Sequence, residues 1–361
     1  MIRGPRPAPA GTLLLAAAAL AVSVPAAGGA LPFAVAHRIE LATGSPVVAL
    51  AFAADGKLAY AAAGDELHVF EVSTGAPEAL VKAPGPVVSL ATSAEAGGTL
   101  YAAVGTPARL LVLSLHPLRV RSSVALRGGA PSGLLYEPGE HALYLESRAG
   151  GSVTRLDSGD GKAIAVAHLQ GDLAQMTADG RGRLYVANTA TDAIDVIGTA
   201  RMMALGAIPT PDCHAPAGLD LDPVGRRLFV ACGNATALVI DTDMGFAFEQ
   251  LPIQKGTALR TVFAFHPGGP GGWKGGAFIA GDGPGLDAIR MNAFISYASG
   301  GSMPLPGRAT ALAVNPSAEQ LWIAIAPREV SSAPGGAAAA GDARQEPGVQ
   351  ILALGANGGA R

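Results

Sequence analysis

The feature that most constrains the fold is an aromatic residue that recurs every 41 to 49 residues along the chain. In most copies it follows a leucine near the start of a short apolar run. The seven positions are Tyr60, Tyr101, Tyr144, Tyr185, Phe229, Phe278 and Trp322. A repeat of roughly 40–45 residues with about four strands per unit is the sequence signature of a propeller blade. Seven such positions predict an all-β, seven-bladed β-propeller.

The clearest copy of the repeat runs from Pro216 to Gly245. Leucine and aspartate alternate over residues 219–222, which is the period of a strand with one buried face. Asp222-Pro223-Val224-Gly225 follows, and Pro and Gly supply the backbone angles of a tight turn. Two apolar runs, 228–232 and 237–240, then predict two further strands. A meander of this size cannot bury both of its faces, so it requires neighbouring copies.

Two copies resemble a known repeat. Arg183-Leu-Tyr-Val-Ala-Asn188 and Arg227-Leu-Phe-Val-Ala231 are similar to the YVTN-type repeat of bacterial seven-bladed propellers. The copies around Tyr101 and Phe278 lack the Asp-Pro or Asp-Gly turn of that pattern. The resemblance implies a secreted or periplasmic propeller, and it implies no single activity because the fold hosts many.

The propeller is expected to occupy residues 31–361 as one domain and one monomer. Its last blade has a third strand at Val349–Leu354 and no sequence left for a fourth. The segment Phe33–Leu41 lies outside the repeats and alternates, so we expect it to pair with that blade and close the ring. Residues 331–347 have no apolar periodicity and predict a flexible loop.

Residues 1–30 read as a secretory signal peptide. Arg3 and Arg6 precede an uncharged apolar run over 12–24, and Val24-Pro25-Ala26 supplies small residues for cleavage near Ala26 or Ala27. An uncleaved anchor is the alternative, although the run is short for a membrane span. The signal predicts a periplasmic or secreted protein without stable membrane insertion.

The net charge and the motifs of the sequence reduce the number of functions that need to be considered. Removal of residues 1–26 takes away two of the 25 basic residues and none of the 28 acidic ones, so the net charge changes from −3 to −5. A net acidic chain without a basic run has no electrostatic reason to bind nucleic acid. The sequence contains no phosphate loop, no Cys-x-x-Cys-His haem motif and no nucleophile elbow, so it indicates no cofactor and no catalytic residue.

The two cysteines, Cys213 and Cys232, occupy nearly opposite positions of one predicted hairpin. In an oxidising compartment this arrangement favours a disulfide, and two free thiols are the alternative. A zinc site is disfavoured because only His214 lies nearby and structural zinc takes four ligands.

The longest connection between blades, residues 209–217, should line one rim of the ring together with the turns of its neighbours. Polar side chains at this rim are candidates for ligand binding, and the alternative is that they cap turns by bonding the nearby backbone. The candidates are Asp212, His214, Asn188, Asp192 and Asn234.

Three functions remain open on the sequence. The first is a binding module for a protein or a small molecule. The second is a metal-dependent, lactonase-like hydrolase, which requires carboxylate and amide ligands around a cation on the channel axis. The third is an accessory protein of a periplasmic dehydrogenase. The rim residues point to recognition, because neither a nucleophile–base pair nor a complete ligand set accompanies them.

Overall fold

The computed structural model describes residues 31, 33–93, 95, 98–115, 117–265, 275–293, 296–317, 320–328 and 349–356. The predicted signal peptide over 1–30 and the predicted loop over 331–347 lie outside the described residues. Within the described part of the chain every regular element is a β-strand. That part of the chain also contains no helix of the length and apolarity needed to cross a membrane.

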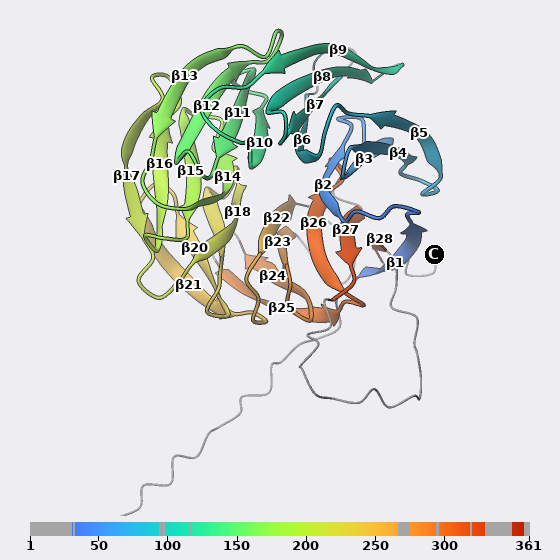
Figure 1. Cartoon of the computed structure of the whole chain (residues 1–361). Helices are drawn as coiled ribbons and strands as arrows, with labels where there is room; N and C mark the ends of the chain where they lie inside the picture. The colour runs from blue at the N-terminus through green and yellow to red at the C-terminus, as the bar shows by residue number, and fades with distance from the viewer. Residues whose placement is uncertain are drawn as a thin grey trace, which may run out of the picture.

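The strands form seven four-stranded antiparallel sheets that stand around a ring like blades (Figure 1). Blades 1 to 3 comprise β2 (Val47–Phe52), β3 (Leu58–Ala63), β4 (Glu66–Glu71), β5 (Pro77–Lys82), β6 (Val87–Ser93), β7 (Thr99–Val104), β8 (Arg109–Leu115), β9 (Leu118–Ala125), β10 (Gly133–Glu137), β11 (Ala142–Ser147), β12 (Ser152–Asp157) and β13 (Ala163–His168).

Blades 4 to 6 continue the same meander and are followed by blade 7, whose strands come from both ends of the described chain. They comprise β14 (Leu173–Ala178), β15 (Arg183–Asn188), β16 (Ala193–Gly198), β17 (Met203–Pro209), β18 (Pro216–Asp222), β19 (Arg227–Cys232), β20 (Thr236–Asp241), β21 (Phe246–Pro252), β22 (Arg260–Phe265), β23 (Gly275–Ala280), β24 (Gly285–Ala293), β25 (Ser296–Pro304), β26 (Arg308–Val314), β27 (Gln320–Ala326), β28 (Gln350–Ala356) and β1 (Phe33–Glu40).

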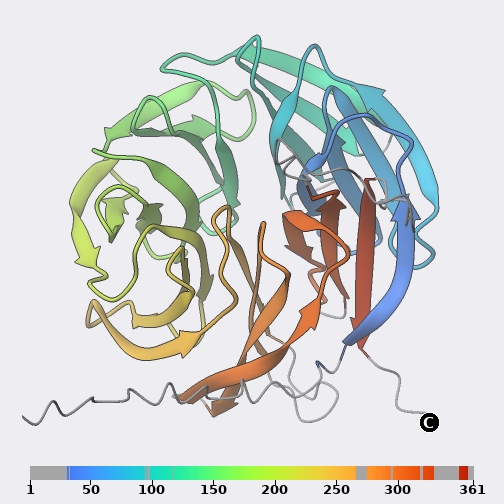
Figure 2. The same ribbon diagram turned by 60° about the horizontal axis from the view of Figure 1, so that its bottom comes forward.

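The ring closes through blade 7, as the sequence predicts. Its strand order is β26, β27, β28 and β1, with β1 outermost. β1 runs antiparallel to β28 in a register that pairs Phe33 with Ala356 and Glu40 with Gln350. Figure 2 shows β1 lying along the outer side of the last blade. This pairing gives blade 7 the fourth strand that its own segment lacks.

The recurring aromatic residues hold neighbouring blades together. Each lies in the second strand of its blade, and all seven are almost fully buried. Tyr185 of blade 4, for example, packs with Leu228 and Val230 of blade 5, and Trp322 of blade 7 packs with Ala59 and Ala61 of blade 1. The apolar core is therefore divided into seven clusters, one at each boundary between blades.

The meander gives the ring two different faces. The connections between blades and the turns between second and third strands lie on one face, which we call the connection face. The turns between first and second strands, and between third and fourth strands, lie on the other, which we call the turn face. The first strand of each blade borders the central channel, and the fourth forms the outer wall (Figure 1).

Candidate functional site

The loop between β17 and β18 is fixed by the predicted disulfide. Cys213 in this loop and Cys232 at the end of β19 are joined, with their Cα atoms 5.2 Å apart. Both cysteines are fully buried. The Cys213 N–H also donates to the Thr210 carbonyl over 2.9 Å, which closes a tight turn inside the loop. The loop is thus tied covalently to the blade that follows it.

Four of the predicted rim residues come together on the connection face, and we call Asp192, Asp212, His214 and Asn234 the rim cluster. His214 Nδ1 lies 3.0 Å from Asp192 Oδ2, across the boundary between blades 4 and 5. The His214 backbone N–H donates to Asn234 Oδ1 over 3.2 Å, and Asn234 Nδ2 donates to the Asp212 carbonyl over 3.1 Å. The His214 side chain is 65% exposed, and that of Asp192 is 42% exposed. The cluster is therefore accessible and also held in place.

The backbone in and directly beside the rim cluster adopts angles that are uncommon for residues other than glycine. Asp192, Ala215 and Ala235 have φ values of 49°, 50° and 63°. For alanine the left-handed region costs about 1–2 kcal/mol, so surrounding contacts must hold it. Asp192 Oδ1 accepts the Ala215 N–H over 2.8 Å and supplies one such contact. Strained backbone of this kind concentrates at functional sites.

Asn188 does not join the rim cluster. Its side chain is fully buried, and its Nδ2 donates to the Gln170 carbonyl over 2.5 Å and to Asp195 Oδ2 over 2.8 Å. Its Oδ1 accepts the Ala190 N–H over 3.2 Å. These contacts are those of a turn-capping residue, which is the alternative that the sequence leaves open. Asn188 stabilises the turn that carries Asp192 and is not itself accessible.

Electrostatics in the rim cluster favour the ionised carboxylate of Asp192. The contact with His214 and the bond from the Ala215 N–H hold the pKa of Asp192 below its usual range. Among the described residues no three His, Cys, Asp or Glu side chains gather closely enough to share a metal ion. The arrangement at the rim can accept and donate hydrogen bonds.

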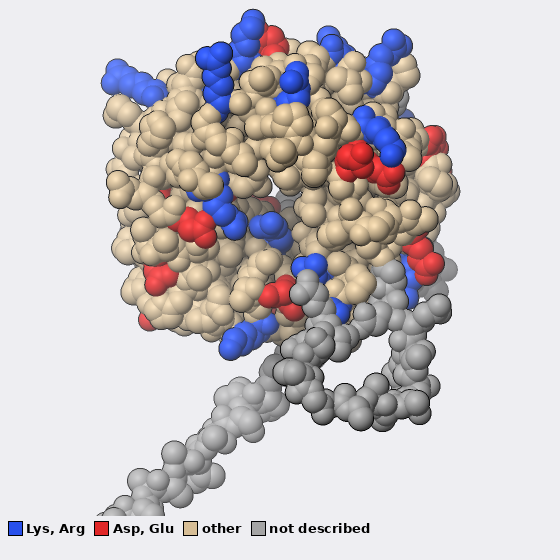
Figure 3. Space-filling model, in the orientation of Figure 1, with Lys and Arg blue, Asp and Glu red and all other residues tan. Residues whose placement is uncertain are grey.

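A second polar site lies in the central channel, where the sequence interpretation placed no candidate. The channel holds a cavity of about 290 Å³, lined by the first strands of several blades. Its charged lining residues are Glu146, Arg148, Asp220 and Arg260. Figure 3 shows the hollow at the centre of the ring, with Lys or Arg side chains beside it. We call Ser132, Glu146, Arg148 and Arg260 the channel site.

Glu146 is a buried carboxyl group in this site. It is only 3% exposed, and Ser132 Oγ donates to its Oε1 over 2.8 Å. Gly133 leaves room for it, because a Cβ at that position would lie 2.9 Å from Glu146 Oε2. Burial raises the pKa of Glu146 to about 7, although Ser132 and the two guanidinium groups of Arg148 and Arg260 act in the opposite direction.

The channel also tests the metal-dependent alternative. A divalent cation on the axis requires several carboxylate or amide oxygens directed at one point. The channel instead places two guanidinium groups near its buried carboxyl group, and Asp220 is engaged with the Thr177 hydroxyl over 3.2 Å. This donor chemistry does not fit a divalent cation.

The channel residues leave a sequence signal that becomes visible when the blades are aligned. Arg260 pairs with the residue two positions after the recurring aromatic of its blade, the place taken by Ala49 in blade 1 and by Ser89 in blade 2. When equivalent positions of the blades are compared, an arginine among small residues indicates that blade 6 differs from the others at the channel wall. Glu146 has no comparable signal, because its burial depends on the facing strand β10.

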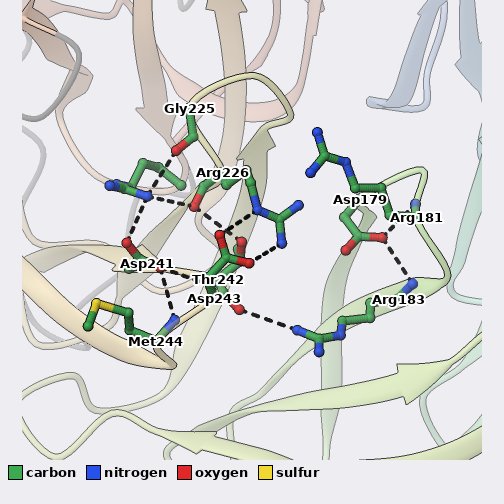
Figure 4. Close-up of polar contacts among 10 residues, drawn as sticks. Asp179, Arg181, Arg183, Gly225, Arg226, Asp241, Thr242, Asp243 and Met244 are labelled. Carbon is green, nitrogen blue, oxygen red and sulfur yellow. Dashed lines mark hydrogen bonds and ion pairs between the residues drawn. The ribbon is translucent and has the colours of Figure 1, made fainter.

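The turn face of blades 4 and 5 carries a third polar group, an ion-pair network that links the two blades (Figure 4). Arg226 donates two hydrogen bonds to the Asp243 carboxylate, from Nε over 2.7 Å and from Nη2 over 2.5 Å. Arg183 reaches from blade 4 to the Thr242 carbonyl of blade 5 over 3.4 Å. The contact from Arg183 crosses the boundary between the two blades, and the Arg226–Asp243 pair lies beside it. The network therefore helps to hold blades 4 and 5 together. Beside it runs a groove of about 250 Å³ that includes Leu205 and Met244.

The comparisons with known proteins concern the fold. No family model matches the chain. No curated protein matches its sequence either. Many solved structures are similar, among them the structure of U3-55K, with a TM-score of 0.69 and 14% identity over 87% of this chain and 97% of that chain. The crystal structure of the RRP9 WD40 repeats gives a TM-score of 0.70 and 14% identity, over 89% and 99%. At this identity the likeness establishes a WD40-like propeller fold and nothing further.

Proposed function

We propose that this chain is an exported binding module that recognises a protein partner through the rim cluster. The observation that carries the proposal is the combination of exposure and rigidity at Asp192, His214 and Asn234. These side chains are accessible, yet they are bonded to one another and to a loop closed by a disulfide. A surface that is ordered before binding loses little conformational entropy when a partner docks.

The chemistry of the rim cluster favours recognition through hydrogen bonds. It offers an ionised carboxylate, an imidazole and an amide within one small area of the connection face. The described residues supply no nucleophile beside a base at this rim, so binding is the activity that the contacts support. An accessory role beside a periplasmic dehydrogenase would be one case of such binding.

Export is the second part of the proposal. The basic and apolar segments within residues 1–26, the YVTN-type resemblance and the disulfide all suit a periplasmic or secreted protein. The intact mass of the exported protein tests this part. A chain that starts at or soon after Ala27 supports it, and a chain that retains Met1 in the membrane fraction identifies an uncleaved anchor.

The partner surface is tested by a capture experiment with periplasmic extract. The rim variant Asp212→Ala/His214→Ala removes two exposed side chains outside the strands. Its matched control, Leu205→Ser/Met244→Ser, alters two exposed residues of the groove on the turn face. We expect the rim variant to weaken capture of the partner by about 1–3 kcal/mol, with the fold unchanged.

The two variants separate the possible outcomes. Partner loss in the rim variant alone supports recognition at the rim cluster. Loss in the groove variant alone moves the binding surface to the turn face and contradicts the proposal. Equal retention by both variants also contradicts it, provided that their circular dichroism and melting temperatures match those of the unmodified chain.

A further inference from the structure

The channel site has an unusual chemical composition, since a cationic group is present in a confined space without its own counter-ion. Within the described residues, no carboxylate lies within 4.0 Å of the Arg260 guanidinium, and that guanidinium donates no hydrogen bond to the protein. Glu146 is the acidic group that acts on it electrostatically, and burial lowers the pKa of Arg260. Arginine nevertheless stays cationic at neutral pH.

The position of Arg260 is fixed from the neighbouring strands. Gln175 of β14 reaches past β18 to β22, where its Nε2 donates to the Thr261 carbonyl over 2.8 Å. Its Oε1 accepts the Thr261 N–H over 3.1 Å and the Leu219 N–H over 3.3 Å. Two of these three bonds hold the backbone next to Arg260, and the third links the same side chain to β18. A planar guanidinium carried by a well-held strand is suited to bidentate recognition of a carboxylate.

The remaining lining of the cavity is mixed. Ser89, Gln175, Thr177 and Asp220 are polar, and Val48, Leu50, Val88 and Leu90 form an apolar stretch of the wall. At the register position of Arg260, blades 1 and 2 place the small residues Ala49 and Ser89. Val48 and Val88, which precede them, also line the cavity. Since a water molecule takes up about 30 Å³ in the liquid, the cavity of about 290 Å³ holds a molecule of roughly ten non-hydrogen atoms. The cavity therefore combines a cationic group with polar side chains and one apolar stretch of wall.

We propose that the central channel binds a small aliphatic carboxylate, whose carboxylate group pairs with Arg260 and whose hydrocarbon part lies against the Val48 and Val88 wall. This site is separate from the rim cluster and does not depend on the proposed protein partner. Glu146 acts as the adjoining hydrogen-bond donor in its protonated form. In its ionised form it repels the incoming carboxylate.

The pH dependence follows from the groups that surround Glu146. Ser132 donates to it from the start of blade 3, and Arg148 and Arg260 face it with positive charge. Asp172, the other nearby carboxylate, is engaged with Arg148 Nε at 3.5 Å. With the pKa of Glu146 at about 7, the binding-competent protonated form decreases about tenfold from pH 6 to pH 8. Carboxylate affinity should decrease by the same factor.

The experiment uses isothermal titration of the full chain with hexanoate and with hexanamide, its neutral counterpart. We expect hexanoate to bind at pH 6 at least about tenfold more tightly than hexanamide, because the amide lacks the charge that pairs with Arg260. This arm requires no mutation, so it stays decisive if a variant fails to fold. Equal binding of the two probes, or no binding of hexanoate at millimolar concentration, overturns the proposal.

Single substitutions test whether Arg260 and Glu146 are responsible for hexanoate binding and for its pH dependence. Arg260→Gln should weaken hexanoate about tenfold or more, whereas Arg109→Gln on the outer part of blade 2, where the guanidinium bonds Ser123, should change nothing. Glu146→Gln should bind hexanoate with the same affinity at pH 6 and pH 8. An Arg260→Gln variant that binds like the unmodified chain overturns the site, and a pH-dependent Glu146→Gln variant overturns the role of Glu146.

Discussion

The rim cluster and the channel site each place a carboxyl group near a basic side chain, and they differ in how these groups are paired and exposed. At the rim, Asp192 and His214 are exposed and contact each other at 3.0 Å. In the channel, Glu146 is 3% exposed, and Arg260 has no carboxylate at ion-pair distance among the described residues. Both sites stand on the same scaffold of repeated strands.

This difference indicates what each site can bind. Exposed groups that already bond one another lose little on contact with a large surface, and they contribute orientation more than affinity. A buried charge without a partner carries a desolvation cost that a small counter-ion of the right shape offsets. On this comparison we propose a macromolecular partner for the rim and a small anion for the channel.

Both sites require the closed ring, and the largest expected effect tests that common requirement. Deletion of residues 33–41 removes the strand that pairs with β28 and leaves the edge of blade 7 bare. The melting temperature should decrease sharply, and the protein should aggregate in size-exclusion chromatography. Deletion of residues 331–345, which the sequence predicts to lie outside the strands, is the control and should do little. Equal effects from the two deletions would contradict the closure.

Removal of the disulfide tests whether the rim cluster and the channel site bind their ligands independently. The bond joins residues 19 positions apart, so Cys213→Ser/Cys232→Ser should destabilise the fold by about 3 kcal/mol in urea unfolding. Partner binding at the rim should weaken, because the loop loses its covalent link. Hexanoate affinity should stay the same. A parallel loss of both activities would show that the two sites are not independent.

Glu146→Gln tests burial in the channel through its pH dependence. The folded-state pKa of Glu146 is raised from 4.5 to about 7, so its contribution to stability is present below pH 4.5 and is lost as pH rises through 7. Glutamine does not ionise, and since one pKa unit corresponds to 1.36 kcal/mol the variant should be more stable than the unmodified chain at pH 8 by about 3 kcal/mol. At pH 4.5 the advantage should disappear. A constant difference across this range would contradict the buried carboxyl group.

Asp192→Asn should have the smallest effect. The pKa of Asp192 is lowered by His214 and the Ala215 N–H, so its contribution is present above its usual pKa and is lost as pH decreases. Because the pair is exposed, the loss at pH 7 should stay below about 1 kcal/mol. Thermal unfolding at pH 7 and at pH 3 measures it, and the two proteins should converge at the lower pH. If Asp192→Asn lowered the stability of the fold as much as removal of the disulfide, the distinction between an exposed rim and a buried channel site would be contradicted.

The fold is predictable because one physical requirement is repeated. Tyr185 and its counterparts each fill one boundary between blades. Because every blade contributes one such aromatic, the number of blades can be counted from the sequence. The pairing of β1 with β28 follows from a strand shortage in blade 7, which is also visible in the sequence. Register within each hairpin is likewise local, and it brings Cys213 within reach of Cys232.

The sites are predictable only in part, because they depend on contacts between blades. Asp192 and His214 were placed on one rim by strand count, and the structure brings them into contact. The burial of Asn188 depends on Gln170 and Asp195, which no turn pattern reveals. Glu146 lies near Arg260 only because blades 3 and 6 both face the channel, and their positions are far apart in sequence.

The pairing of β1 with β28 also determines when the ring can be completed. Residues 33–40 are among the earliest parts of the ring to be synthesised, whereas residues 350–356 emerge more than 300 positions later. Contacts between such distant segments form slowly, so blades accumulate before the ring closes. A chain that is interrupted before β28 retains two unpaired strand edges, and such edges recruit other chains. Closure therefore distinguishes finished molecules from truncated ones, and proteases that act on incompletely folded chains can remove the latter.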